Sequence, residues 1–476
     1  YNNDRKSTHW GVKVAHGIMN LSSMTYVGFN PWGNINNYAV GRLNNMIETG
    51  GALYYCRKCA VNATIEFNKT AYTDFFKRLS HSGAVGFGVK NKYSEQNPYS
   101  KAGAAIEHYY MLDSSAEMRE QLSQGGETLG GYMRDKLSWG YFLQDQGEFN
   151  VQSKVGMAIL MSHKMRRGPK ENNDVISLWE ALQYNHKTGK MTMKEGYDTF
   201  IEYGTGMEEK YTDRTRYNIR NNIREVNKQI HGNYAHDDRM AMQSTAIGEL
   251  LAQFHKWVAP AMRARYRTEY FDENIGWIEG RYMTLWTFMT HVFWNKVNVE
   301  KSYKDKASEF WQDDQKGRMR RANVLRTATD VSLMVTSLMM AQILNSLFDD
   351  EDEDKSIVRK RFENAMIYQF HRQASELKLF IPIFGQKELW MMAKSPIAAS
   401  RYLGEWADVI NTGFFTPFAY LTKSKEDFYA DKRYVYQTGT RKGKLKFNKE
   451  WRDITPLIYA FQRFKMYDNM KDFYVK

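Results

Sequence analysis

Two cysteines, Cys56 and Cys59, are the residues whose type and spacing most readily suggest chemistry. A structural zinc ion needs four ligands, and one Cys-x-x-Cys pair supplies two of them. His81 or His108 would have to complete the set, and their spacing does not indicate it. A thioredoxin-like redox pair is an alternative, although no βαβ pattern surrounds the cysteines. The simplest interpretation is two reduced thiols on one turn of a helix.

Two glycine-containing loops have the composition of phosphate-binding loops but lack the surrounding frame. Residues 83–88 read GAVGFG, and residues 188–190 read TGK. A phosphate-binding loop joins a strand to a helix and ends in Lys followed by Ser or Thr, and neither segment meets both conditions. We therefore interpret the first as a flexible turn and the second as a hairpin turn.

Histidines and carboxylates also gather at 231–238, where His231 and His236 precede Asp237 and Asp238. Gly232 interrupts the helix between the two histidines, so they do not share a helix face, and the aspartates suit the cap of a following helix. The sequence contains no HExxH or GxSxG motif. We predict that the chain is not an enzyme and has no cofactor or metal, while a catalytic pair assembled from distant segments remains an open alternative.

The chain is organised around residues 216–267, which predict two helices joined by a turn. Apolar residues at steps of four, three and four form one stripe of the first helix: Ile219, Ile223, Val226 and Ile230. The turn follows at His231-Gly232-Asn233. The second helix has its own apolar stripe, and Pro260 is expected to end it. This second stripe comprises Ile247, Leu250, Leu251, Phe254, Trp257 and Val258.

Basic side chains accompany both predicted helices and are the candidate contacts with nucleic acid or with a partner protein. They are Arg216, Arg220, Arg224, Lys228, Arg263, Arg265 and Arg267. The whole chain has 67 basic and 54 acidic residues, a net charge of +13. This charge is consistent with contact with nucleic acid or an acidic protein surface, although an excess spread over so long a chain is more often a solvated surface. No helix presents an arrangement typical of base recognition, so sequence-specific DNA binding is not expected.

The same region carries a resemblance to a known group of proteins. Arg224-Glu225-Val226-Asn227, Ile230-His231-Gly232-Asn233-Tyr234, and Phe254 to Pro260 followed by Arg263 and Arg265 resemble large virion proteins of crAss-like podoviruses. Residues 182–196 and the Gly-Lys-rich hairpin at 434–451 are similar to the same proteins. His255 departs from the pattern, which has Arg or Lys there.

The resemblance implies a location in the virion and supplies no active site. Proteins of this group are very long structural or cargo proteins packaged inside the particle. We therefore expect an internal component of the capsid, portal or tail lumen that is ejected with the genome. The expected partners are other virion proteins, with packaged DNA and the host membrane as further candidates. The alternatives are a DNA-binding internal protein and a membrane-active, channel-forming protein used in genome delivery.

Residues Val331 to Phe348 contain no charged side chain and are followed by the acidic run 349–354. Eighteen residues reach the lower limit for spanning a bilayer, for which about 20 are needed. Ser, Thr, Gln and Asn interrupt the segment, which favours a bundle core or a subunit interface over lipid. The candidate packing or membrane residues are Leu333, Leu338, Ile343, Leu344 and Leu347.

Composition favours a mainly α fold. Only 8 of 476 residues are proline, whereas Met and the aromatic residues are plentiful. We predict an extended multi-helix assembly with short β-hairpins and no single compact enzyme fold. Because the chain starts at Tyr1 rather than Met, we expect it to be a segment of a longer polypeptide. The predicted regions are 1–168 (helical and irregular, rich in Gly and aromatics), 169–215 (helix–hairpin–helix), 216–348 (central, basic and apolar) and 349–476 (helical, with a hairpin near 434–447).

Overall fold

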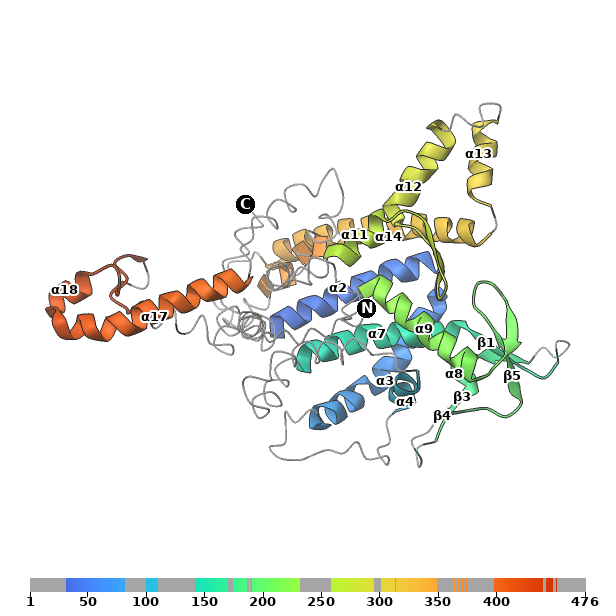
Figure 1. The fold of residues 1–476 in the computed structure, drawn as a ribbon, viewed down its shortest axis with the longest axis horizontal. Coiled ribbons are helices and arrows are strands. Elements are labelled where there is room, and N and C mark those ends of the chain that lie inside the picture. The colour runs from blue at the N-terminus through green and yellow to red at the C-terminus, as the bar shows by residue number, and fades with distance from the viewer. Residues whose placement is uncertain are drawn as a thin grey trace, which may run out of the picture.

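The computed structural model shows a mainly α-helical protein with a few short antiparallel strands and, in the part it describes, no closed barrel (Figure 1). This confirms the predicted fold class. The residues described are 31–81, 100–109, 142–169, 174–185, 188, 191–231, 258–294, 301–312, 314–348, 398–439, 442–447 and 451, together with a few positions between 363 and 374.

Helix α7 (Phe142–Ser162) lies at the centre of the largest core. Every residue from Val151 to Leu160 is buried, and the stretch from Val155 to Met161 has no charged side chain. Such a run is apolar on all sides and has to be surrounded by other elements. The surrounding helices are α2 (Pro31–Gly51), α3 (Arg57–His81), α4 (Lys101–His108) and α9 (Asp213–His231).

A small antiparallel sheet closes one end of this core. Its order is β2-β1-β5-β6, and Met165 of β1, fully buried, lies opposite Ile176 and Phe200. A separate two-stranded hairpin pairs β3 with β4. The strands are β1 (Lys164–Arg167), β2 (Val175–Ser177), β3 (Leu182–Tyr184), β4 (Met191–Met193), β5 (Tyr197–Ile201) and β6 (Glu208–Lys210).

The predicted helix–hairpin–helix at 169–215 is wrong in its helices, although a hairpin, β3 with β4, lies within it. The structure limits helix to the single turn α8 (Leu178–Ala181), capped by Ser177, and places strands on either side of it. Residues 197–201, inside the region predicted as helix–hairpin–helix, form β5, which pairs with β1 on one side and β6 on the other. Gly196 and Gly204 adopt φ of +84° and +97°, which ends regular structure at both sides.

The stripe predicted on the first central helix is confirmed. Ile219, Ile223 and Val226 of α9 are buried in the core that also contains α7 and the sheet. That core includes residues from Tyr55 to Val226, so it crosses the positions 168 and 215 at which the predicted regions meet.

Residues 258–348 form a second set of helices. They comprise α11 (Val258–Tyr266), the hairpin β7 (Tyr270–Asp272) and β8 (Gly276–Ile278), α12 (Arg281–Met289), the π-helix η6 (Thr290–Trp294), α13 (Tyr303–Phe310) and α14 (Gln315–Phe348). Contrary to the sequence prediction, Pro260 does not end its helix, because the chain remains helical to Tyr266. The predicted second stripe lies outside the described residues except for Val258.

The C-terminal part contains α17 (Ala398–Thr422), which includes Pro417, and α18 (Lys425–Ala430), which extend away from the other labelled helices in Figure 1. The hairpin predicted near 434–447 is present as one antiparallel bridge between Val435 and Leu445. Tyr436 N–H donates to the carbonyl of Lys444 at 3.1 Å beside it.

Candidate interaction surface

The predicted basic stripe of α9 is half-buried and partly paired within the protein. Arg216 contacts Asp213 at 3.2 Å, and Lys228 contacts Glu225 at 3.0 Å, both one helical turn away. Arg220 and Arg224 are also only partly exposed. The stripe therefore does not form an open row of solvent-facing cations, and its role in binding stays a prediction.

The three candidate arginines near the end of α11 have three different surroundings. Arg263 is exposed, whereas Arg265 is buried and lies 3.7 Å from Asp330. Arg267 packs over the ring of Tyr270, with 3.5 Å between guanidinium carbon and ring centroid. Only Arg263 of the three points freely to solvent, so Arg265 in particular is placed for internal pairing and not for nucleic acid.

A buried charge cluster joins α11 and α12 to α14. Asp330 lies 2.6 Å from Arg281 and accepts a hydrogen bond from the Tyr282 hydroxyl at 2.9 Å, and its side chain is 1% exposed. Burial lowers the pKa of Arg265 to about 10, and repulsion from Arg281 acts in the same direction. Two buried cations thus share one carboxylate, which makes this carboxylate essential to the packing of the three helices.

A second buried pair fixes α14 to α2. Arg326 donates to the carboxylate of Glu48 and to the side-chain oxygen of Asn323 at 2.7 Å. Asn323 in turn donates to the carbonyl of Glu279 at 2.9 Å. These bonds hold the first half of α14 in one orientation. Because α14 is one continuous helix, they also determine which side of its second half faces α2.

The second half of α14 is largely open to solvent. Leu333 packs with Met334 against Leu43 and Ile47 of α2, and Leu344 is half-buried. Met340 is also half-buried, whereas six apolar side chains are between 40% and 64% exposed: Val331, Val335, Leu338, Met339, Ile343 and Leu347. Ser337 and Ala341, by contrast, are buried. We call these six exposed residues the α14 face.

Of the five residues predicted here as packing or membrane positions, Leu333 packs on α2 and Leu344 is half-buried, whereas Leu338, Ile343 and Leu347 are exposed. Among the described helices, Gln315–Leu347 is the one long and apolar enough to cross a bilayer, judged by length and composition. Only 17% of its most apolar window is buried, so it differs from the core helix of a soluble domain.

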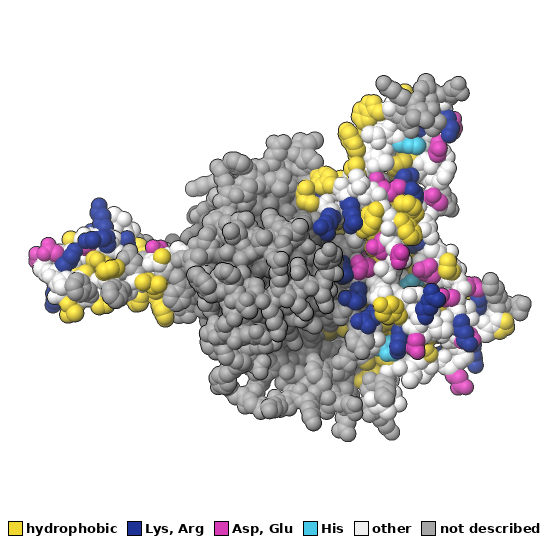
Figure 2. All heavy atoms as spheres, viewed as in Figure 1, with side chains coloured by type: hydrophobic (Ala, Val, Ile, Leu, Met, Phe, Trp, Pro, Cys, Tyr) yellow, Lys and Arg dark blue, Asp and Glu magenta, His cyan; other side chains and the backbone are white. Residues whose placement is uncertain are grey.

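Residues 281–294 and 301–310 form a second exposed apolar feature, the aromatic arm, which was not among the predicted contact residues. Helices α12 and α13 rise side by side from α14 in Figure 1, and hydrophobic side chains gather along this arm in Figure 2. Trp286, Phe293, Trp294 and Tyr303 are each more than half exposed. The Trp286 and Trp294 ring centroids lie 5.8 Å apart.

The run from Tyr282 to Trp294 was visible in the sequence as an apolar stretch. What could not be seen was the π-helical turn at Thr290–Trp294, which changes the helical phase of its last aromatics. His291, within this stretch, is half-buried with its ring 5.6 Å from that of Phe310.

The residues first considered for chemistry lie only partly within the described part of the chain. No group of three or more His, Cys, Asp or Glu that could hold a metal ion occurs among the described residues. His231 is part of this region, whereas His236, Asp237 and Asp238 lie outside it. The prediction of two reduced thiols is wrong for this structure, in which Cys56 and Cys59 form a disulfide.

Acidification is expected to destabilise the fold through His163. Its Nδ1 accepts a hydrogen bond from the backbone N–H of Tyr203 at 3.0 Å, and burial lowers its pKa from 6.5 to about 4. Between these two values the unfolded chain binds a proton that folded His163 does not. Stability should therefore fall as pH drops through this window, by on the order of 3 kcal/mol in total.

Urea unfolding at pH 7 and pH 4.5 measures this effect, with His163→Gln as the comparison. Burial also lowers the pKa of His231, to about 3, but this contribution is common to both proteins. The variant should be less stable at pH 7 and should lose less stability on acidification. Equal losses in the two proteins would show that His163 is not the titrating group.

Comparison with known protein families, curated proteins and solved structures finds no match to this chain.

Proposed function

We propose that this chain is an internal structural component, or cargo protein, of a bacteriophage virion. It lies in the capsid, portal or tail lumen and is ejected with the genome. The observation that carries the proposal is the α14 face, six apolar side chains left uncovered on a helix that the protein itself anchors firmly. The resemblance of residues 224–234 and 254–265 to crAss-like virion proteins gives the assembly in which such a face is expected.

An uncovered apolar face of this kind favours association. Exposed apolar surface is stabilised when another molecule removes it from water, and large contiguous apolar patches on soluble proteins mark interaction sites. The aromatic arm adds a second surface with the Trp and Tyr side chains that are enriched in protein interfaces. Both features fit a subunit that contacts other virion proteins.

Passage through a narrow channel is compatible with the covalent structure. The disulfide between Cys56 and Cys59 has a sequence separation of three, so it closes only a very short loop and leaves the chain able to extend. Most described elements are helices, whose contacts are local and re-form quickly after unfolding. Ejection with the genome therefore requires no break of a long-range cross-link between these two cysteines.

Mass spectrometry of purified particles tests the proposal. Peptides of the chain should be found in genome-filled particles, should be protected from added protease there, and should be lost from particles that have ejected their DNA. The major coat protein serves as the internal standard. Retention of the chain on the outside of emptied particles would overturn the proposal.

A membrane-active role in genome delivery is the second candidate, because the exposed half of α14 coincides with the segment long and apolar enough to cross a bilayer. In this case the α14 face meets lipid of the host envelope after ejection. Insertion into liposomes separates this role from a purely structural one.

A further inference from the structure

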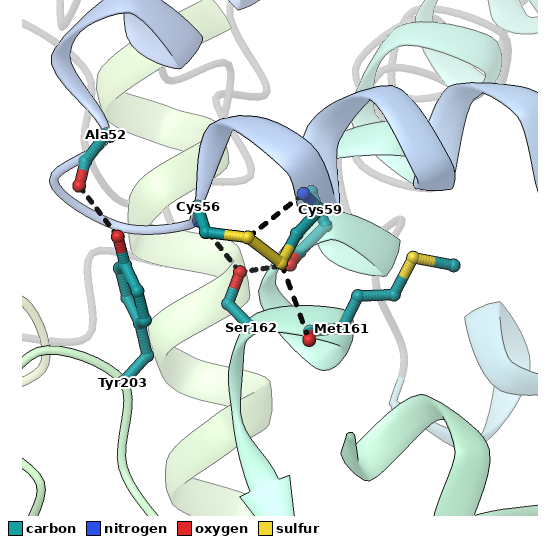
Figure 3. Close-up of a disulfide and its surroundings, with 7 residues drawn as sticks. Ala52, Cys56, Cys59, Met161, Ser162 and Tyr203 are labelled. Atoms are coloured by element: carbon teal, nitrogen blue, oxygen red, sulfur yellow. Dashed lines mark hydrogen bonds between the residues drawn. A yellow bond between two sulfur atoms is a disulfide. The ribbon is translucent and has the colours of Figure 1, made fainter. Parts of the chain in front are cut away.

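Cys56 and Cys59 lie at the start of α3, next to the end of α7 (Figure 3). Cys56 directly precedes the first helical residue, and its sulfur accepts a hydrogen bond from the backbone N–H of Cys59 at 3.0 Å. The first sulfur thus occupies the position of a helix N-cap acceptor. Both cysteines are partly exposed.

The surroundings of the first sulfur favour negative charge. Arg57 and Lys58, both exposed, separate the two cysteines, and the first turn of α3 contains no acidic residue. Arg57 donates to the carbonyl of Gly50 at 2.8 Å, which fixes the guanidinium near the start of the helix. Cations and the N-terminus of a 25-residue helix both stabilise a thiolate over a thiol.

The second sulfur has a partner suited to the reduced state. Cys59 Sγ lies 3.6 Å from the carbonyl oxygen of Met161, which can accept a hydrogen bond from a Cys59 thiol (Figure 3). The backbone N–H of Cys56 donates to Ser162 Oγ at 2.9 Å, and this hydroxyl donates to the carbonyl of Ala158 at 2.7 Å. These backbone contacts do not involve either sulfur, so they persist when the disulfide opens.

We propose that Cys56 and Cys59 form a redox-active dithiol–disulfide site that exchanges with thiols of small molecules or of a partner protein. In the reducing direction, an external thiolate attacks Cys56 Sγ, the bond between the two cysteines breaks, and Cys59 leaves as a thiolate that takes up a proton. A second external thiolate then attacks the external sulfur of the mixed disulfide, releasing Cys56 as the thiolate. Two external thiolates become one disulfide, and the protein gains two electrons and one proton, which is bound by Cys59 while Cys56 stays a thiolate.

In the oxidising direction the roles follow from the geometry. Cys56, at the N-cap beside Arg57 and Lys58, is the nucleophile that attacks an external disulfide. This step forms a mixed disulfide and releases the first external thiolate. Cys59, held by Met161, then attacks Cys56 Sγ and releases the second external thiol. This exchange does not depend on where in a virion the chain resides.

The full-length chain should interconvert reversibly in buffers of reduced and oxidised glutathione. After acid quenching and alkylation, mass spectrometry measures the fraction with both cysteines labelled. The same curve should be obtained starting from the oxidised and from the reduced protein. A disulfide that glutathione neither opens nor re-forms would show a purely structural cross-link and would overturn the proposal.

Single-cysteine variants test the assignment of the two roles. In Cys59→Ser, the rate of Cys56 alkylation should rise with pH to a midpoint below the value of about 8.5 typical of a free thiol. In Cys56→Ser, the midpoint for Cys59 should be higher than that for Cys56. A Cys56 midpoint at or above the free-thiol value contradicts the proposed nucleophile.

A charge reversal beside Cys56 tests the electrostatic part of the proposal, and the same reversal further along α3 is its matched control. Lys58→Glu, made in the Cys59→Ser protein, replaces a cation near Cys56 by an anion and should raise the pKa of the Cys56 thiol by roughly half a unit. Because one unit changes the thiolate fraction about tenfold, the rate of Cys56 alkylation at pH 7 should fall by roughly two- to fivefold. Lys69→Glu changes an exposed lysine three turns further along α3 and should leave the rate unchanged. Equal effects of the two substitutions would argue against a local electrostatic role.

Discussion

Replacement of Asp330 by Asn should lower the free energy of unfolding by about 3–5 kcal/mol, the cost of removing one partner from a buried ion pair. Asp330 lies 2.6 Å from Arg281 and 3.7 Å from Arg265, and all three side chains are at least nine-tenths buried. The neutral amide keeps the shape but removes the negative charge that both buried guanidinium groups face. The substitution also replaces one of the two carboxylate oxygens, and Oδ2 is the one that accepts the hydrogen bond from the Tyr282 hydroxyl.

Urea unfolding followed by tryptophan fluorescence measures this loss. Asp408→Asn, on the exposed side of α17, is the matched control and should change stability by less than about 0.5 kcal/mol. In a double variant that also carries Arg281→Met, part of the lost stability should return, because one uncompensated cation has been removed. A change below about 1 kcal/mol for Asp330→Asn would contradict the role given to this cluster.

If the exposed half of α14 enters lipid, a single charge at Leu338 should abolish insertion into liposomes. Leu338 lies near the middle of the segment 331–348, where a carboxylate costs roughly 2.5–3.5 kcal/mol on insertion scales. The side chain is already 40% exposed in the folded protein, so Leu338→Asp should not disturb its packing. Liposome leakage and carbonate-resistant association are the measurements.

Leu325→Asp is the control for this experiment. Leu325 is on the same helix and is 43% exposed, but it lies outside the uncharged segment, between Arg321 and Arg326. It should leave leakage unchanged. Loss of leakage in both variants would indicate a general effect of charge on α14, and no leakage in the unmodified protein would remove the membrane role while leaving the structural role intact.

The sequence predicted what depends on local periodicity. The stripe of Ile219, Ile223 and Val226 identified α9, and low proline content indicated the mainly α class, both of which the structure confirms. The uncharged run at 331–348 was recognised as well. Whether this run is covered by other parts of the protein depends on contacts that the sequence does not show. The small residues Ser337 and Ala341 are the buried ones, and their spacing did not reveal this in advance.

Features that depend on long-range contacts were missed. Arg265 looked like one of a row of basic contacts, because its partner Asp330 lies on a different helix far along the chain. Tyr197–Ile201 fell in the region predicted as helix–hairpin–helix. It is a strand because it pairs with β1 and β6, which the local sequence does not show. The two cysteines were interpreted as simple thiols on a helix turn. Their neighbours Ser162 and Met161 come from the end of α7, far along the chain, and could not be seen from the local sequence.

A reconstruction of genome-filled particles would decide whether the chain is an internal contact protein. Density for α2, α7 and α14 should lie inside the shell, portal or tail, with another virion subunit covering the α14 face around Leu338 and Ile343. Density on the outer surface of the particle, or an α14 face left open to solvent inside it, would contradict the proposed function.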